Sequence, residues 1–465
     1  MPIVTINVST TNPPTPNQLQ RTGAFISQGG TSLSAGTLSL LTNISSLASI
    51  LSGAKSLASL TWSGSVVTGT TSAPHGLPSG QNITLIVSGV TPAAYNGVFT
   101  CAITGASTFT YALVSNPGAA TVTNATVTDE DVSELNAMNT TYWANGSSNA
   151  VYVLELGAGD AAHGVTALTS FINANQNTIY SFLVPRYWDT EATFKTMVSN
   201  YTSLSSMVDF FVTTTTSTYA AWQALAYNCI YAYVEAPAVV ALAAAGTSTE
   251  FSLAADFYNT LANNPNSATP VGPQSFRFLF GVTPYPLAGN STILASLKAA
   301  NINYAITGAE GGISNVMTVY GHMLDGNPFN YWYTTDWAQI NLDLNIANEV
   351  INGSNNVINP LYYSQNGIDR LQNRAASTLR SGAAAGLILG QILTVKLDAL
   401  TFAANVSNGV YAGNAVVNAV PFTNYNTLNP NDYAIGKYAG LQAAITPARG
   451  FESIIFNLNI TNFVA

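Results

Sequence analysis

One short motif in the middle of the chain has the spacing of a dinucleotide-binding turn. Gly157-Ala158-Gly159-Asp160-Ala161-Ala162 fits the pattern Gly-x-Gly-x-x-Gly/Ala, and it lies between an apolar run and a helical pattern. Against a cofactor, Asp160 would place a negative charge beside a pyrophosphate at the helix start, where the site must favour anions. A tight strand-to-helix turn capped by Asp160 explains the same residues. We favour that interpretation and expect no cofactor.

The other residues that could do chemistry form no catalytic pattern. His75, His163 and His322 are far apart in the sequence and none lies four residues from another, so no zinc motif forms. The sequence has neither a Gly-x-Ser-x-Gly elbow nor a Gly-Lys-Ser/Thr phosphate loop. It still allows a Ser/His/Asp triad, because the members of a triad need not be adjacent in the sequence. The carboxylates of Asp129-Glu130-Asp131 and Glu134 predict a capped, solvated helix start. The sequence therefore predicts neither an enzyme nor a metal site.

The composition favours a protein that works in an assembly. Only 7% of the 465 residues are Asp, Glu, Lys or Arg, against about 25% in ordinary soluble domains. A surface so poor in charge does little to prevent self-association. The net charge of −9 argues against binding to nucleic acid or to an anionic membrane. The longest apolar run, Ala383 to Val395, is too short to span a bilayer, and Met1 to Val8 lack the basic start and apolar core of a signal peptide.

The chain is long enough for two to four domains, and its residue composition and pattern change between residues 61 and 128. Leu38 to Leu60 carries apolar residues at helical spacing, which predicts a helix. Alternating runs separated by turn signals follow at Ile83 to Ser88, Val98 to Ile103 and Thr108 to Val114, and they predict a small all-β module. Because a helical pattern returns at Asp129, we expect residues 61–128 to be inserted into a core of residues 21–60 and 129–449.

The core alternates between strand and helix patterns. Buried-type strands are expected at Val151 to Leu156, Ile179 to Val184 and Val208 to Thr213, with helices between them. This rhythm predicts an α/β (α+β) core with a mixed sheet and flanking helices. Three later stretches are predicted to be helical, namely Tyr219 to Gly246, Trp337 to Ile351 and Ile368 to Leu397. The aromatic cluster Phe329 to Trp337 has two interpretations, a carbohydrate platform or a buried core or subunit contact, and we favour the second.

Both chain ends have the pattern of a β-strand. Apolar residues alternate with polar ones from Ile3 to Val8, and a proline-rich segment, Asn12 to Asn17, follows as a stiff tether. The other end alternates in the same way from Gly450 to Ala465. Each strand could be an edge strand of its own domain or an arm that pairs with a neighbouring subunit. The candidate arm residues are Ile3, Val4, Ile6, Val8, Ile454, Phe456, Leu458 and Ile460.

Several of these segments together resemble the sheath proteins of contractile bacteriophage tails. The resemblance lies in Val151 to Gly157 with the following helix and Ile179 to Pro185, in Tyr331 to Asp336, in the Asp369/Arg370 helix and in Asp432-Tyr433-Ala434 before the β-patterned end. The 61–128 module is similar to small β modules at the surface of phage structural proteins. The resemblance covers nearly the whole chain, but no single motif in it is diagnostic.

The resemblance implies a mechanical role without a cofactor. Sheath subunits form stacked rings, hexameric in this family, around a tail tube, and they contact baseplate and tail terminator proteins. It further implies that the arms, residues 1–20 and 450–465, add strands to sheets of neighbours, and that contraction drives the tube through the host envelope. The expected location is the virion, after assembly in the host cytoplasm. The alternative is a virion adhesin or decoration protein whose β module binds a receptor or glycan.

One late helix contains three of the twelve basic residues, Arg370, Arg374 and Arg380. Arg370 and Arg374 are four residues apart and share a helix face. With the resemblance in view, the part from about 337 to 449 is expected to face the tube, and these arginines are the candidate tube contacts. The alternative is a solvated helix face on which Arg370 pairs with Asp369 or with another local carboxylate.

Overall fold

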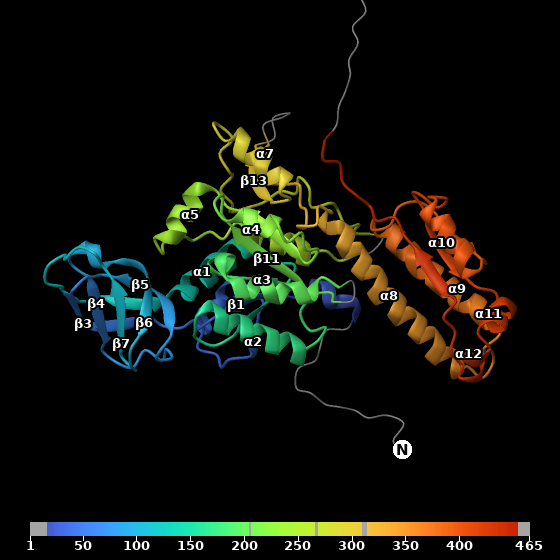
Figure 1. The fold of residues 1–465 in the computed structure, drawn as a ribbon, viewed down its shortest axis with the longest axis horizontal. Coiled ribbons are helices and arrows are strands. Elements are labelled where there is room, and N and C mark those ends of the chain that lie inside the picture. The colour runs from blue at the N-terminus through green and yellow to red at the C-terminus, as the bar shows by residue number, and fades with distance from the viewer. Residues whose placement is uncertain (1–15, 204–205, 266–267, 309–313, 454–465) are drawn as a thin grey trace, which may run out of the picture.

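The computed structural model describes residues 16–203, 206–265, 268–308 and 314–453 as three lobes (Figure 1). A large α/β lobe lies in the middle, a β-barrel on one side of it, and a smaller α/β lobe on the other side, at the far end of the long helix α8 (Phe329–Ser354). The predicted terminal strands, Ile3 to Val8 and Ile454 to Ile460, lie outside the described residues.

The large lobe is built on a mixed sheet, as the sequence predicted, and this sheet has six strands. Its strand order is β12-β11-β10-β1-β9-β2, and every neighbouring pair is parallel except β9 with the edge strand β2. The strands are β1 (Gly23–Ser27), β2 (Thr37–Leu41), β9 (Val151–Glu155), β10 (Ser181–Leu183), β11 (Asp209–Thr214) and β12 (Ile230–Val234). All residues of β1, β10, β11 and β12 are buried, because helices cover both faces of the sheet.

Alternate strand residues enter two separate hydrophobic clusters on the two faces. Phe25 and Phe211 pack with helices α1 (Glu130–Ala144) and α6 (Leu253–Leu261) and with the start of α8, whereas their neighbours Ala24 and Phe210 belong to the other cluster. The helices of the second face are α2 (Ala161–Ala174), α3 (Ala192–Val198), α4 (Tyr219–Gln223) and α7 (Ser291–Ala299). The remaining elements of this lobe are η1 (Pro16–Arg21), η4 (Arg186–Thr190), η5 (Ser199–Tyr201), α5 (Pro237–Ala244), β13 (Tyr304–Thr307) and β14 (Val316–Val319).

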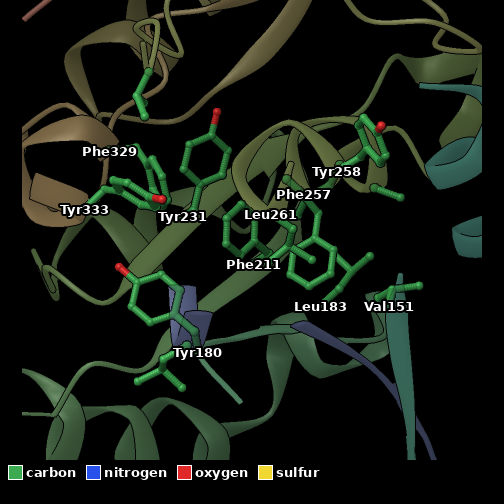
Figure 2. Close-up of a cluster of buried hydrophobic side chains, with 14 of the residues drawn as sticks. Val151, Tyr180, Leu183, Phe211, Tyr231, Phe257, Tyr258, Leu261, Phe329 and Tyr333 are labelled. Atoms are coloured by element: carbon green, nitrogen blue, oxygen red, sulfur yellow. The ribbon is translucent and has the colours of Figure 1, made fainter. Parts of the chain in front are cut away.

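The start of α8 is anchored in this core by its aromatic side chains. Figure 2 shows Phe329 and Tyr333 beside Tyr231 and Tyr180 of the sheet region. The ring centroids of Phe329 and Tyr231 are 6.3 Å apart and those of Tyr333 and Tyr180 are 6.5 Å apart, both with near-perpendicular planes. Phe329 and Tyr333 are each 1% exposed. The aromatic cluster is therefore core packing, as favoured over a carbohydrate platform.

A closed six-stranded barrel lies between β2 and β9 along the chain. Its order is β3-β4-β7-β6-β5-β8, and it closes because β8 pairs with β3, with Lys55 opposite Val127. The strands are β3 (Lys55–Ser63), β4 (Val66–Thr71), β5 (Asn82–Ser88), β6 (Gly97–Ile103), β7 (Thr108–Ala112) and β8 (Thr126–Asp129), with the short helix η3 (Ala93–Tyr95) between β5 and β6. The barrel has a hydrophobic core of its own, which includes Val67 and Phe109.

The helix predicted for Leu38 to Leu60 is wrong. This stretch forms β2, the short helix η2 (Ile44–Ser49) and the first part of β3. Leu41 and Leu47 are buried in the large core, but Leu40 and Ile44 are exposed, so the apolar residues do not share one helix face. The spacing was helical by coincidence, and β2 gains its stability by pairing with β9.

The smaller lobe packs α9 (Gln365–Ala384) between α8 and a three-stranded sheet. The sheet order is β15-β16-β17, with β15 (Ile392–Val395) parallel and β17 (Leu441–Ala444) antiparallel to the central strand β16 (Ala415–Ala419). Three further helices complete it: α10 (Ala399–Ser407), α11 (Phe422–Leu428) and α12 (Pro430–Ala434). The late part of the chain is therefore mixed in structure, not only helical.

Two predicted helices are shorter than expected. The helix expected over Ile368 to Leu397 ends at Ala384, because Gly386 and Gly390 adopt left-handed φ values of +74° and +73° and turn the chain into β15. The stretch Tyr219 to Gly246 contains α4 and α5, but Ile230–Val234 between them is the edge strand β12. This strand was not predicted, because alanine-rich, helix-favouring stretches lie on both sides of its short apolar run.

Candidate functional site

The turn at residues 157–162 joins β9 to α2 at the carboxyl edge of the large sheet. Gly157 takes a left-handed φ of +89°, and Asp160 caps α2 by accepting a hydrogen bond from the His163 backbone nitrogen at 3.0 Å. Gln28 donates to the Asp160 carbonyl oxygen at 2.8 Å, and the Asp160 nitrogen donates to Oε1 of Gln81 at 3.1 Å. The chain's own side chains therefore occupy this helix start. The predicted capping role of Asp160 is confirmed.

Glu155, at the end of β9, organises the loop that follows β1. Its carboxylate accepts hydrogen bonds from the Ser27 hydroxyl at 2.7 Å and from the Thr31 hydroxyl at 2.6 Å. It also accepts from the backbone nitrogens of Gly29, Thr31 and Gly157 at 2.8, 3.2 and 2.7 Å. A buried carboxylate with five donors is satisfied without a metal or ligand. The only sequence signal for this role is a single charged residue at the end of an apolar strand.

The acidic start of α1 is buried, which corrects the prediction of a solvated helix face. Asp131 and Glu134 are 1% and 5% exposed, because this helix start packs between the loop after β1 and the barrel. The Asp129 carboxylate caps α1 by accepting from the Asp131 nitrogen at 3.1 Å, and Asp131 accepts from the Gln28 nitrogen. Burial, reinforced by neighbouring carboxylates, raises the pKa of Asp129 to about 7 and that of Glu130 to about 8.

One arginine neutralises part of this acidic region. Nη1 of Arg186 lies 2.5 Å from Oε1 of Glu134, and its Nε and Nη2 contact the two carboxylate oxygens of Glu235 at 2.7 and 2.9 Å. Nη2 also donates to the Glu250 carbonyl oxygen at 2.6 Å, and the guanidinium carbon lies 4.1 Å from the centre of the Phe251 ring. Burial opposes the positive charge, but the two carboxylates outweigh it and raise the pKa of Arg186. This network fixes α1, η4 and the end of β12 to one another.

The three histidines lie in different parts of the fold. His163 pairs with Asp160 at the exposed start of α2, with 2.6 Å between Nδ1 and Oδ1. Nε2 of His322 lies 2.8 Å from Oε1 of Glu452, and His75 is buried in the barrel. Within the described ranges, no group of three or more His, Cys, Asp and Glu side chains is arranged to hold a metal ion. Cys101 and Cys229 are both free and buried.

The three candidate tube-contact arginines differ in their surroundings. Nη2 of Arg370 contacts Oε1 of Glu349 on α8 at 2.7 Å, and Nη2 of Arg374 donates to Oδ1 of Asn345 on the same helix at 2.7 Å. Both side chains therefore hold α9 against α8. Arg380, nearer the end of α9, is exposed. Asp369 pairs with Lys396, with 2.8 Å between Nζ and Oδ1.

The sheet of the smaller lobe has two open edges among the described residues. Neither β15 nor β17 pairs there with a further strand on its outer side. The Val420 nitrogen donates to the Gly440 oxygen at 3.0 Å, and hydrogen-bonded pairs alternate along an antiparallel ladder, so the backbone of Ala443 faces outward. On β15, the Gln391 oxygen accepts from the Ala415 nitrogen at 3.0 Å, which by the same alternation turns the backbone of Thr394 outward. Both residues are exposed.

Two solved structures of the anti-feeding prophage are similar to this chain. One is its helical sheath in the contracted state, with 14% identical residues, a TM-score of 0.49 and coverage of 98% of each chain. The other is its baseplate in the contracted state, with 11% identity, a TM-score of 0.48 and coverage of 99% of this chain and 98% of that one. The first is a sheath, the class of protein that the sequence resembles. No protein-family model and no curated protein matches the chain.

No helix within the described residues is both long enough and apolar enough to cross a membrane. The long helices α8 and α9 instead carry polar side chains that hydrogen-bond between them, such as Arg374 with Asn345.

Proposed function

We propose that this chain is the structural subunit of a contractile tail sheath. In this role it polymerises as stacked, hexameric rings around a tail tube, between baseplate and terminator proteins, and drives the tube through a host envelope when it contracts. The particle is a phage-type virion assembled in the bacterial cytoplasm. The subunit needs no catalytic site for this work, and Asp160, within the motif that best fits a cofactor, caps α2.

The observation that carries the proposal is the open sheet β15-β16-β17. Open edges present unpaired backbone donors and acceptors, and an isolated protein usually blunts them with charges, proline or a covering segment. Neither Thr394 nor Ala443 carries a charge. The two chain ends, Ile3 to Val8 and Ile454 to Ile460, have the alternating sequence pattern of strands that such an edge accepts. Arms from neighbouring subunits would complete each sheet and keep the subunits linked during contraction.

The tube-facing surface in this proposal is the side of the smaller lobe where α9 lies. Since Arg370 and Arg374 are engaged with α8, Arg380 is the arginine of this helix that offers its charge most freely to an acidic tube surface. Exposed ion pairs of this kind suit a contact that holds the extended sheath and must later be released, because each pair stabilises the contact by less than about 1 kcal/mol.

Electron microscopy of the purified protein tests the polymerising role directly. The parent chain is expected to form long tubes or helical polymers. A double variant, Thr394→Pro with Ala443→Pro, removes one outward-facing N–H from each edge and should abolish the tubes while leaving a folded subunit. A chain truncated after Gly450 removes one arm without touching the sheet and should give the same result.

The matched control is Thr394→Val with Ala443→Val, which changes the same side chains but keeps both N–H groups. It should polymerise like the parent chain. Circular dichroism and gel filtration establish that each variant is folded. Tubes from the folded double-proline variant would refute the role of the sheet edges, and small closed oligomers from the parent chain would refute the sheath role itself.

A further inference from the structure

A cavity of about 200 Å³ lies where the mouth of the barrel meets the loop after β1. Its wall combines barrel residues, such as His75 and Phe109, with Gly29 of that loop and with Asp129 at the start of α1. The mouths of β-barrels and the borders between lobes are common ligand sites. This border also lies at the carboxyl end of β1, which has β9 on one side in the sheet and β10 on the other. The chain passes from β1 to β9 and then crosses to β10, so the strand order reverses at β1. Open α/β sheets bind ligands at such a point.

His75 contributes a hydrogen-bond donor that has no acceptor. The side chain is 7% exposed, and its Nδ1 accepts a hydrogen bond from the Leu77 backbone nitrogen at 3.1 Å. In the neutral ring the proton must then be on Nε2. Nε2 is buried and has no partner among the described residues. A buried donor left in this state is unfavourable, so it calls for an acceptor that enters the cavity.

Asp129 contributes the complementary acceptor. Its Oδ1 caps α1, but its Oδ2 is buried and has no hydrogen-bond partner in the described part of the chain. The cavity wall therefore includes one buried donor and one buried acceptor that have no partner in the described part of the chain. A group that both accepts and donates, such as a pair of neighbouring hydroxyls, satisfies both.

The rest of the wall limits the size and charge of a ligand. Leu77, Leu85, Phe109 and Val127 provide an apolar side that suits C–H groups. The volume equals roughly six or seven water molecules at about 30 Å³ each, which is the size of one small ring and well below the cavities of about 300 Å³ or more that hold drug-sized ligands. Lys55 and Asp129 both line the cavity, so its wall carries one basic and one acidic side chain and suits a ligand without net charge. No group of three or more His, Cys, Asp and Glu side chains that could hold a metal ion occurs within the described ranges.

We propose that this cavity binds one neutral ring that carries adjacent hydroxyls, as in a single sugar unit. His75 donates to one hydroxyl through Nε2, Asp129 accepts from its neighbour through Oδ2, and the apolar wall contacts the C–H face of the ring. The inference does not depend on the proposed sheath role, because it concerns the border between the barrel and the large lobe. It adds a recognition function to a chain whose remaining features are structural.

Titration calorimetry and saturation-transfer NMR on the full chain test this with glucose, galactose, N-acetylglucosamine and rhamnose as probes. At least one sugar is expected to bind saturably. Asp129→Asn keeps the helix cap but replaces the acceptor, and His75→Phe keeps the ring but removes the donor; each should weaken binding about tenfold or more. His163→Phe, on the exposed start of α2, is the matched control and should bind like the parent chain.

Two comparisons distinguish the source of the ring. If the natural ligand is one ring of a polysaccharide, a polysaccharide fragment should bind as well as the monosaccharide. If the natural ligand is a free sugar, only the monosaccharide should bind. Either result supports the site. Glycerol, which has adjacent hydroxyls but no ring, should bind far more weakly. The proposal is overturned if no sugar binds, if glycerol binds as tightly as the best sugar, or if folded Asp129→Asn and His75→Phe both retain the parent affinity.

Discussion

Charged side chains are rare in this protein, and many of those it has are buried. Eight of the 21 acidic residues are among the buried residues, namely Asp131, Glu134, Glu155, Asp189, Asp209, Glu235, Asp256 and Asp336. The surface is therefore even poorer in charge than the composition suggests, which strengthens the expectation of self-association. Three of the buried acids, Glu134, Glu155 and Glu235, contact Arg186 or the loop after β1 and so fix the carboxyl edge of the large sheet.

Removing the charge of Arg186 should destabilise the large lobe severely. Arg186→Met keeps most of the side-chain volume but leaves Glu134 and Glu235 buried without a positive partner. Breaking a buried ion pair in this way costs about 3–5 kcal/mol. Urea unfolding should show a correspondingly lower free energy of unfolding. Arg380→Met, on an exposed position, is the control and should change stability by less than about 0.5 kcal/mol. Equal effects in the two variants would mean that the network does not stabilise the lobe.

The stability of the large lobe should decrease from acidic to neutral pH, partly through Asp336. Burial raises the pKa of Asp336 to about 7, although Oδ2 accepts a hydrogen bond from the Tyr180 hydroxyl at 2.8 Å. In the unfolded chain an aspartate has a pKa of about 3.9. The folded state therefore binds the proton more tightly, and its stabilising effect is complete below about pH 4 and is lost as the pH rises towards 7.

Asp336→Asn should make the melting temperature depend less on pH between 4 and 8. The amide oxygen can still accept from Tyr180, so the variant should remain folded and be relatively more stable than the parent chain at pH 7 than at pH 4. Asp343→Asn, on the exposed side of the same helix, should leave the parent pH profile unchanged. A melting profile for Asp336→Asn with the parent slope would contradict the assignment.

At the scale of elements, the sequence predicted best where one period dominated. The strands expected at Val151 to Leu156 and Val208 to Thr213 occur as β9 and β11, and the runs Ile83 to Ser88 and Val98 to Ile103 occur as β5 and β6. Buried parallel strands consist mostly of apolar residues, and barrel strands alternate apolar with polar residues, so both have a sequence pattern that is easy to recognise. The predicted mixed sheet with flanking helices is confirmed for the same reason.

Prediction failed where tertiary contacts override the local pattern. Leu38 to Leu60 has helical spacing, but pairing of β2 with β9 and of β3 with β4 and β8 decides its structure. The capping role of Asp160 was predictable because its partner lies three residues away. The partners of Glu155 and Arg186 lie up to 128 and 64 residues away, and no local rule relates them. Sequence reasoning therefore identified the cap but missed the network around it.

At the scale of the molecule, the barrel is joined to the rest of the chain at adjacent points. Lys55 at its first strand pairs with Val127 at its last, so the chain leaves and rejoins the large lobe at one place. The strands occupy residues 55–129, slightly more than the 61–128 expected for the module. The barrel also buries its own hydrophobic cluster, separate from the two clusters of the large sheet. A segment with these properties can be removed without opening the core of the remainder.

Replacing residues 55–127 with a short Gly-Ser linker should therefore yield a folded chain that still polymerises. The linker spans only the distance between paired strands, about 5 Å between α-carbons, and Asp129 remains in place to cap α1. Some loss of stability is expected, because Gln81 no longer accepts from the Asp160 nitrogen and the buried carboxylates at the start of α1 gain access to water. Electron microscopy should show tubes, and the variant should have lost sugar binding, since most of the cavity wall is gone. A linker variant that is folded but remains monomeric would show that the barrel belongs to the polymer contacts, and the smaller lobe alone would then not suffice for assembly.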